Sequence, residues 1–272
     1  MKSCIVYTVK DDPHHLRCLS KSLKLVSDNL IQVKGLFDTD FIFFNDPPVV
    51  FKGVIMNLLE DKLDELKKAY GIKNNFIYKV FDTRQPDYSP EIKAKITTQI
   101  GYKNMCRFWA GEIFKDKDIL NYDYYLRLDC DSYITDRVPY DPFKLIDSED
   151  KFYGHLKGAI FQDSPHVIVD FRKTLMEFEW GYNGKIIKSC MDFPEGSLYF
   201  TNFEIVKPLS FRDSGYMDLY KYLDNTGGIY MHRWGDAPIR YAGINMLMGN
   251  SGVMEILDIK YTHQHFVNGV LV

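Results

Sequence analysis

The sequence predicts a single mixed α/β domain, and two patterns in its 272 residues support this prediction. Short apolar runs alternate with longer segments whose apolar residues recur every three or four positions, as in sheets flanked by helices. Hydrophobic residues make up 46% and charged residues 26% of the chain, so it can bury a substantial core. No internal repeat, low-complexity tract or clear linker divides the sequence.

The N-terminal segment predicts a strand followed by a helix. Ser3–Val9 is a short apolar, β-branched run suited to a buried strand. The break after it offers Asp12 as a helix N-cap and Pro13 as the first helical residue. From His14 to Leu30, apolar residues recur with steps of three or four, which predicts an amphipathic helix.

The alternation of strands and helices continues along the chain. Apolar runs bounded by turn residues predict strands at Asp40–Phe44, Phe76–Phe81, Asp123–Leu128, Phe152–Ile160 and Val253–Ile259. Helical spacing predicts helices at Asn57–Tyr70, Lys95–Phe114, Val167–Trp180, Phe211–Leu223 and after Asp236-Ala237-Pro238. Asn45-Asp46-Pro47-Pro48 is a strong strand stop, and Gly181–Gly196 is predicted to be a mobile connection.

Charge and cysteine content limit the classes of protein to which the chain can belong. A formal charge of −3 argues against a nucleic-acid protein that depends on a broad basic surface. The five cysteines show no CxxC spacing, and Cys4, Cys106 and Cys130 lie in apolar runs, which predicts reduced, buried thiols. No N-terminal apolar segment has signal or membrane length. We therefore expect a soluble protein that either works in the cytoplasm or lacks its targeting segment.

The strongest candidate site is Asp129-Cys130-Asp131, which follows the strand at Asp123–Leu128. Ligands bind at the carboxyl ends of strands in open α/β sheets. Two carboxylates there can reach Mg²⁺ or Mn²⁺, which would also bind diphosphate oxygens and neutralise charge on a leaving nucleotide. Such triplets also occur as solvated turns, and the position after an apolar strand is what favours a cation site.

Two further acids are candidate catalytic residues. Glu204 is the lone acid of Phe200–Ile205, so burial would raise its pKa and require a partner or a catalytic purpose. A carboxylate beside an anomeric carbon can attack it or stabilise oxocarbenium character. The alternative is an acid on a solvent-facing strand edge. Asp236 follows a pair of glycines suited to a tight turn, and it either acts in the site or caps the helix that Pro238 begins.

Aromatic and histidine side chains could complete a sugar and metal site. Aromatics make up 15% of the chain, and sugar clefts use aromatic faces, although an aromatic-rich core is the simpler explanation. Trp234 is accordingly either a sugar platform or a core residue. His263 and His265 alternate after the last predicted strand and therefore share one face. There a neutral imidazole could bind Mn²⁺ beside carboxylates, or the pair could be polar surface.

Several segments together carry a resemblance to a known family. They are Cys4–Val9, Ser20–Ser27, Phe43-Phe44-Asn45-Asp46, Tyr102–Phe108, Tyr122–Asp131, Asn202-Phe203-Glu204, Tyr222-Leu223-Asp224, Gly227-Gly228, Arg233-Trp234-Gly235-Asp236-Ala237-Pro238 and Tyr261-Thr262-His263. In this order they resemble the fungal α-1,2-mannosyltransferases of glycosyltransferase family 15. The resemblance implies a GT-A-like fold, an open mixed sheet flanked by helices, in which the donor binds at the strand ends.

The same resemblance implies the residues that hold the donor. Asp129 and Asp131 match the acidic triplet near the diphosphate and the metal, which is typically Glu-Pro-Asp in the family. His263 matches a metal-ligating histidine. Tyr102 matches a donor-contacting tyrosine, and Arg107 lies in the same motif, where we expect it to hold the diphosphate together with the metal.

The resemblance also implies an activity and its catalytic residues. The family is retaining and uses GDP-mannose and Mn²⁺, so the expected reaction moves mannose onto a hydroxyl of a glycan or glycoprotein acceptor. Glu204 matches the candidate nucleophile, and it would act by direct attack or as a charge stabiliser in a same-face displacement. Asp236 matches an acid on the acceptor side. We expect residues 1–135 to form the nucleotide-sugar-binding half and residues 136–272 the acceptor-binding and catalytic half.

Three alternatives remain open at this stage. The same fold could use another nucleotide-sugar donor, such as a UDP-sugar. The chain could be a glycoside hydrolase whose acid pair is Glu204 and Asp236. It could also be a degenerate carbohydrate-binding protein without turnover, although the acids of the triplet, Glu204, Asp236 and His263 are all present.

Overall fold

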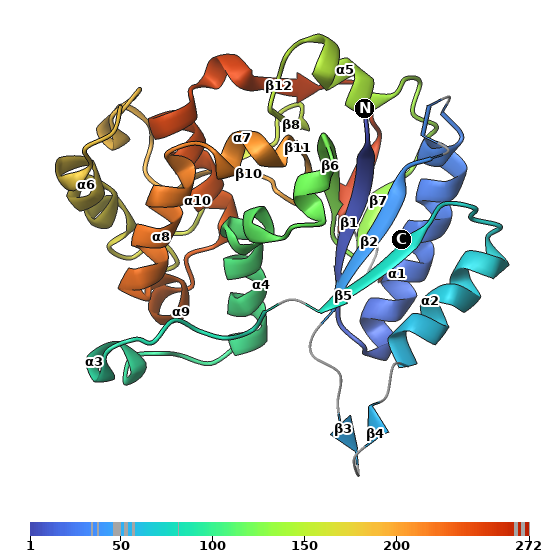
Figure 1. Cartoon of the computed structure of the whole chain (residues 1–272), viewed down its shortest axis with the longest axis horizontal. Coiled ribbons are helices and arrows are strands. Elements are labelled where there is room, and N and C mark those ends of the chain that lie inside the picture. The colour runs from blue at the N-terminus through green and yellow to red at the C-terminus, as the bar shows by residue number, and fades with distance from the viewer. Residues whose placement is uncertain are drawn as a thin grey trace.

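The fold is known from a computed structural model that describes residues 1–33, 35–36, 38–45, 50–51, 54–55, 58–80, 82–263, 266–267 and 270–271. Its main sheet consists of β1 (Ser3–Val9), β2 (Asp40–Asn45), β5 (Phe76–Val80), β6 (Tyr124–Leu128), β8 (Tyr153–Leu156), β11 (Phe203–Val206) and β12 (Val253–Ile256). These seven strands lie in the order β12-β8-β11-β6-β1-β2-β5 (Figure 1). Strand β11 is antiparallel to β6 and β8, and the other neighbours are parallel.

Short strand pairs, ten α-helices and several short 3₁₀ and π segments complete the described part of the chain. The pairs are β3 (Val50–Phe51) with β4 (Val54–Ile55), β7 (Ser132–Ile134) with β13 (Tyr261–His263), β9 (Ile160–Gln162) with β10 (Ser197–Tyr199), and β14 (Phe266–Val267) with β15 (Val270–Leu271). The α-helices are α1 (Pro13–Val26), α2 (Leu58–Ala69), α3 (Pro90–Lys93), α4 (Ile100–Ala110), α5 (Pro142–Ser148), α6 (Phe171–Gly181), α7 (Pro208–Arg212), α8 (Tyr216–Thr226), α9 (Gly228–His232) and α10 (Asp236–Gly243).

Helices cover both faces of the sheet. Helices α1 and α2 lie on one face, whereas α4, α8 and α10 lie on the other (Figure 1). Alternate residues of β1 enter different cores: Ile5 packs with the α1 side, and Val6 packs with the α4 side. A strand buried on both faces must be apolar throughout, which is why the predicted runs are continuous rather than alternating. The predicted mixed α/β class in one domain is confirmed.

The first strand and helix agree closely with the sequence prediction. Asp12 caps α1, since its carboxylate accepts hydrogen bonds from the amides of His14 and His15, both at 3.0 Å. Pro13 is the first residue of α1. The helix continues beyond Val26 as a short π-helical segment over Ser27–Ile31. The predicted strands β2, β5 and β6 and helix α2 are also confirmed, while the predicted Asn57 start, the Phe81 end and the stop after Asn45 lie outside the described residues.

Four predicted elements begin late or are divided, and left-handed backbone positions explain the late starts of two of them. The helix predicted over Lys95–Phe114 begins only at Ile100, because Gln99 has φ 65° and cannot continue a right-handed helix. Similarly, α6 starts after Asp170, which has φ 56°. Such positions follow from tertiary context and leave no mark on apolar spacing.

The other two predicted elements are each divided. The strand predicted over Phe152–Ile160 is β8 followed by β9, which belong to different sheets and are separated by a turn at Gly158 with φ 70°. The helix predicted over Phe211–Leu223 is α7 and α8. The last predicted strand ends at Ile256 instead of Ile259.

The cysteines behave as predicted. All five are free and buried, including Cys4, Cys106 and Cys130. Burial raises the pKa of the Cys106 thiol to about 12, which keeps it protonated and unreactive at neutral pH. Within the described residues, no helix combines the length and the apolar character that crossing a membrane requires.

Candidate active site and metal centre

The candidate site lies where β1 and β6 end and β11 begins. Because β11 runs antiparallel to β6, the residues before Phe203 come to the same edge of the sheet as those after Leu128. A cleft of about 470 Å³ opens at this edge, a size suited to a small ligand. Its lining includes most of the site residues that the sequence predicted, namely Tyr102, Asp129, Asp131, Asp236 and His263.

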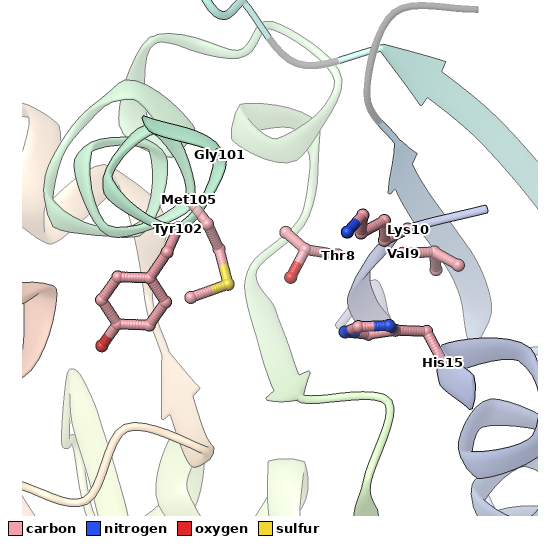
Figure 2. Close-up of a pocket in the computed structure, with 7 residues that line it drawn as sticks. All are labelled: Thr8, Val9, Lys10, His15, Gly101, Tyr102 and Met105. Atoms are coloured by element: carbon pink, nitrogen blue, oxygen red, sulfur yellow. The ribbon is translucent and has the colours of Figure 1, made fainter. Parts of the chain in front are cut away.

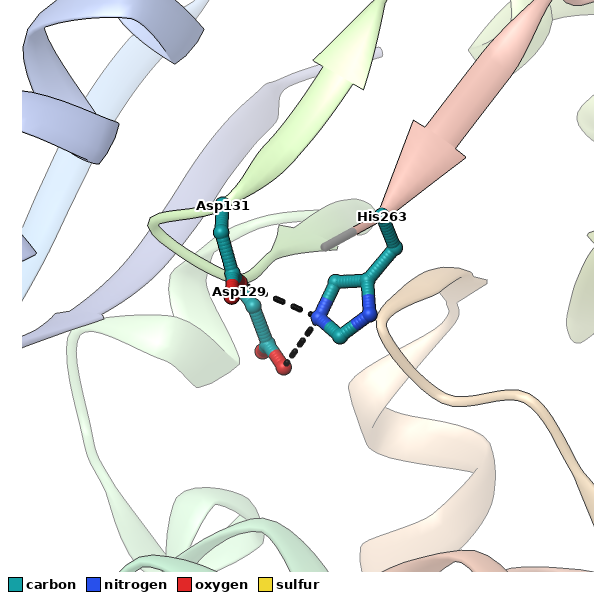
Figure 3. A group of neighbouring side chains, drawn as sticks. All are labelled: Asp129, Asp131 and His263. Carbon is teal, nitrogen blue, oxygen red and sulfur yellow. Dashed lines mark ion pairs between the residues drawn. The ribbon is translucent and has the colours of Figure 1, made fainter. Parts of the chain in front are cut away.

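One end of the cleft holds a cluster of potential metal ligands. Asp129, Asp131 and His263 each place one ligand atom within 4.8 Å of the others (Figure 3). His263 Nε2 lies 3.0 Å from Asp131 Oδ1 and 3.9 Å from Asp129 Oδ2. The histidine reaches this place because β13 pairs with β7 and sets His263 opposite Ser132, the residue after Asp131. His265 lies outside the described residues.

Neighbouring polar groups fix the cluster in place. The Asn202 side-chain amide lies 2.7 Å from both Asp129 Oδ2 and His263 Nε2. The hydroxyl of Ser132 accepts a hydrogen bond from the Asp129 amide and is within 2.7 Å of the Tyr261 hydroxyl. Contacts of this kind hold the side chains that bind a metal in one orientation, and they thereby strengthen metal binding.

The donor set fits Mn²⁺ or Mg²⁺. Two carboxylates and one imidazole suit a hard or borderline divalent cation, and ligands on opposite sides of such an ion lie about 4 Å apart. The three side chains are partly exposed, between 12% and 18%, so solvent or substrate oxygens could complete the coordination.

Arg127 connects the metal cluster to the opposite side of the cleft. Its guanidinium lies over the Trp109 ring at 4.3 Å and is 3% exposed. It donates hydrogen bonds to Asp129 at 3.2 Å and to Asp236 at 2.5 Å. Burial alone would lower its pKa, but Asp236 and Asp129 raise the pKa of Arg127 well above the ordinary value. The guanidinium is therefore permanently charged within the site.

Asp236 belongs to the cleft and does not cap its helix. The N-cap of α10 is Gly235, without a side-chain hydrogen bond, so the capping interpretation is wrong. The Asp236 carboxylate instead accepts hydrogen bonds from Arg127 and from the Thr201 hydroxyl, the latter at 2.8 Å. It is 5% exposed and contributes to the cleft lining.

Glu204 lies beneath the cleft and not among its lining residues. It is fully buried on β11, where its carboxylate pairs with the Arg240 guanidinium at 3.2 Å. Its second cationic neighbour is Arg127, whose Nη1 lies at 3.9 Å. Burial raises the pKa of Glu204, and the two guanidinium groups oppose that rise. The alternative of a solvent-facing acid is wrong, and both catalytic roles stay predictions.

The two predicted donor-contacting residues lie in different environments. Tyr102 is 41% exposed, lines the cleft and carries the Arg233 guanidinium 4.7 Å above its ring. Arg107 does not line the cleft. It is buried and donates hydrogen bonds to Asp224 at 2.8 Å and to Glu112 at 3.2 Å. The structure thus gives Arg107 structural partners, and its predicted contact with diphosphate remains a prediction.

A second cavity adjoins the cleft. It has a volume of about 300 Å³ and is lined by residues from the end of β1, the start of α1 and the start of α4 (Figure 2). Thr8, His15, Tyr102 and Met105 line both spaces, so the two lie side by side. Trp234, the possible sugar platform, lines neither space; it is 2% exposed and packs on Phe171 as a core residue.

Sequence reasoning missed Arg127, Thr201, Asn202 and His15 as site residues. A signal existed for Arg127, because a charged residue within an apolar strand must find buried partners. No local signal marks the other three. Their side chains enter the cleft through the pairing of β11 with β6 and through the position of α1.

The sheet order and the acidic cluster at its carboxyl edge define a GT-A-like fold. More particularly, the chain belongs to the glycolipid 2-alpha-mannosyltransferase family, whose sequence profile matches residues 1–271. It is 30% identical over 187 residues to a probable mannosyltransferase, KTR2, of Saccharomyces cerevisiae, covering 61% of this chain and 44% of that protein. It is 26% identical to the glycolipid 2-alpha-mannosyltransferase of the same yeast, covering 98% of this chain and 62% of that protein.

Solved structures share the fold. Core-mannan synthase A of Aspergillus fumigatus, in a Mn/GDP form, superposes with a TM-score of 0.81 at 20% identity and covers 99% of this chain and 76% of that one. The mannosyltransferase Ktr4p of S. cerevisiae in complex with GDP gives a TM-score of 0.80 at 21% identity, and the match covers 96% of this chain and 71% of that one. The predicted GT-A-like fold and the predicted family are both confirmed.

Replacing Asp131 should weaken cation binding. The Asp131→Asn variant keeps the shape of the side chain but removes one anionic ligand, so we expect Mn²⁺ affinity to fall by at least about tenfold, measured by electron paramagnetic resonance. The matched control is Asp136→Asn, an exposed acid in the segment after β7, which should leave Mn²⁺ affinity unchanged. Equal affinities in both variants would contradict the assignment of the cluster.

Replacing Arg107 should destabilise the fold and spare nucleotide binding. The Arg107→Met variant leaves Asp224 without its cation at 7% exposure, whereas Glu112 keeps Lys115, and we expect a cost of about 3 kcal/mol. Urea unfolding would measure this loss, with Arg212→Met, an exposed pair, as a control expected near zero. A variant of normal stability with GDP affinity reduced tenfold would instead support the predicted diphosphate contact.

Proposed function

We propose that this chain is a retaining glycosyltransferase that moves mannose from GDP-mannose onto a hydroxyl of a glycan or glycoprotein acceptor, with Mn²⁺ as the metal. The observation that carries the proposal is the cluster of Asp129, Asp131 and His263 at one end of a cleft whose other side presents Asp236. This arrangement offers a cation site and a further acid in one space, as transfer from a nucleotide sugar requires.

The relatives supply the proposed donor and metal. The chain is similar to proteins named as mannosyltransferases, and similar structures hold GDP in one case and Mn with GDP in another. The matched regions cover 44% and 62% of the first two relatives, so the activity of the whole protein is proposed and not inherited from them. A UDP-sugar donor and a non-catalytic carbohydrate-binding protein are the alternatives, which these similarities do not favour.

Different residues of the chain have different roles in the proposed reaction. A bound divalent cation would hold the diphosphate and neutralise charge on the leaving nucleotide. Tyr102, exposed at the junction of the two cavities, would orient the donor. Arg127 and Thr201 fix the Asp236 carboxylate by hydrogen bonds, so that it can align or deprotonate the acceptor hydroxyl.

For Glu204 the buried position favours one of its two proposed roles. Its carboxylate is fully buried and outside the cleft lining, so it is better suited to stabilise charge than to attack an anomeric carbon. It would act through Arg127, which lies between it and the cleft and contacts both Asp129 and Asp236. In this role Glu204 is a positioning residue.

The residues that line the two cavities support the two proposed halves of the chain. The smaller cavity is lined by residues between Thr8 and Met105, which supports a donor-binding half at about 1–135. The cleft is also lined by residues from Asp163 to His263, which supports an acceptor-binding and catalytic half at about 136–272.

For the cellular compartment, the five free cysteines support the cytoplasm, with the Golgi lumen as the alternative.

A thermal-shift panel tests the proposed donor and metal together. We expect GDP with Mn²⁺ to raise the melting temperature more than UDP, CDP or dTDP, because a ligand that binds only the folded state stabilises it by mass action. EDTA should remove the shift. A metal-dependent shift with UDP alone would exclude GDP-mannose and keep the transferase class; no shift with any nucleotide, together with undetectable transfer, would favour the carbohydrate-binding alternative.

Replacing Glu204 tests its proposed role. Glu204→Gln keeps the volume and a hydrogen-bond acceptor for Arg240 but removes the charge, so we expect a lower kcat, an unchanged Mn²⁺ affinity and a nearly unchanged KM for the donor. The comparison variant is Asp236→Asn, which should also raise the KM for the acceptor. Near-normal transfer by Glu204→Gln would remove the residue from both proposed roles.

A further inference from the structure

The junction between the two cavities contains one basic side chain. Of the four described residues that line both spaces, only His15 can carry a positive charge. Its ring extends from α1 into the space that Tyr102 and Met105 close from the other side (Figure 2). Any elongated ligand that occupies both cavities must pass this imidazole.

Asp12 holds the His15 ring in this position. The two carboxylate oxygens of Asp12 have separate partners: Oδ1 caps α1 by accepting from the amides of His14 and His15, and Oδ2 lies 2.6 Å from His15 Nδ1. The Lys10 ammonium lies 3.7 Å from the same Oδ2. One carboxylate thus orients an imidazole and lies beside an ammonium at the mouth of the smaller cavity.

The exposed edge of the imidazole faces the space. His15 Nδ1 is buried against Asp12 and makes no hydrogen bond of good geometry, although the side chain as a whole is 44% exposed. The ring therefore has an accessible part away from Nδ1. A carboxylate beside one ring nitrogen orients the imidazole, and the other ring nitrogen can then donate an N–H to an anion.

We propose that His15, held by Asp12, binds the diphosphate of the nucleotide donor where it passes from the smaller cavity to the metal cluster. This inference rests on the proposed function and adds a ligand contact to it. A nucleoside in the smaller cavity and a cation between Asp129 and Asp131 would place the linking phosphates beside the residues common to both spaces. Of these, His15 offers a charge-assisted hydrogen bond to phosphate oxygen.

Two neighbouring histidines provide a matched experiment. His15→Ala and His14→Ala change adjacent residues in the first turn of α1, and alanine preserves helix propensity in both. His14 is exposed and lines neither cavity. We expect His15→Ala to weaken GDP binding in the presence of Mn²⁺ by about tenfold, measured by titration calorimetry, and His14→Ala to bind as the unmodified chain does.

A second pair of measurements separates this contact from the metal site and from the helix cap. Mn²⁺ affinity without nucleotide should be equal in His15→Ala and the unmodified chain. Asp12→Asn should retain the cap, because asparagine caps helices as well as aspartate, and should weaken GDP binding about threefold by freeing the ring. The melting temperature without ligand should change little in all three variants.

Each outcome bears on one proposal. GDP affinity within twofold of the unmodified chain in His15→Ala, or an equal loss in His14→Ala, would overturn the role of His15. Unchanged GDP affinity in Asp12→Asn would overturn the holding role of Asp12. If the unmodified chain binds no nucleoside diphosphate with Mn²⁺, the proposed function fails first and this inference fails with it.

Discussion

The arrangement of the site depends on the buried guanidinium of Arg127. A charged group at 3% exposure must keep its partners, since removing one side of a buried pair costs about 3–5 kcal/mol. Its partners are Asp129 from the end of its own strand, Asp236 from α10 and, at longer range, Glu204 from β11. The guanidinium therefore fixes the relative positions of acids that come from three separate elements of the chain.

The charge balance around Arg127 leaves a role for a cation. The network joins the guanidinium groups of Arg127 and Arg240 to Asp129, Glu204 and Asp236, and Asp131 lies beside His263. With all four carboxylates ionised and His263 neutral, it has two more negative than positive charges. The excess lies at the Asp129–Asp131 end, because Arg240 balances Glu204 and Arg127 lies closer to Asp236 than to Asp129. A divalent cation would balance this excess at the place where the ligand atoms converge.

How much of this could be predicted from sequence differs by residue. The triplet at Asp129–Asp131 was predictable because a strand end and two acids are local features. The burial of Glu204 was not, since it depends on β11 lying between β6 and β8, which the apolar pattern does not reveal. The buried pairing of Arg107 was not predictable for a similar reason: its partner Asp224 is 117 positions away in the sequence. Helix starts at Ile100 and Phe171 depend on left-handed residues that tertiary contacts impose.

The antiparallel strand β11 explains why one edge of the sheet collects both sides of the site. A parallel strand at this position would deliver its end, not its beginning, to the edge where β6 ends. Because β11 starts there, Thr201 and Asn202 arrive beside the triplet, and each contacts an acid on a different side: Thr201 binds Asp236 and Asn202 binds Asp129. Asn202 also contacts His263, which comes from β13 near the end of the described chain. The reversed strand therefore couples the metal cluster to the acid on the opposite side of the cleft within one short segment.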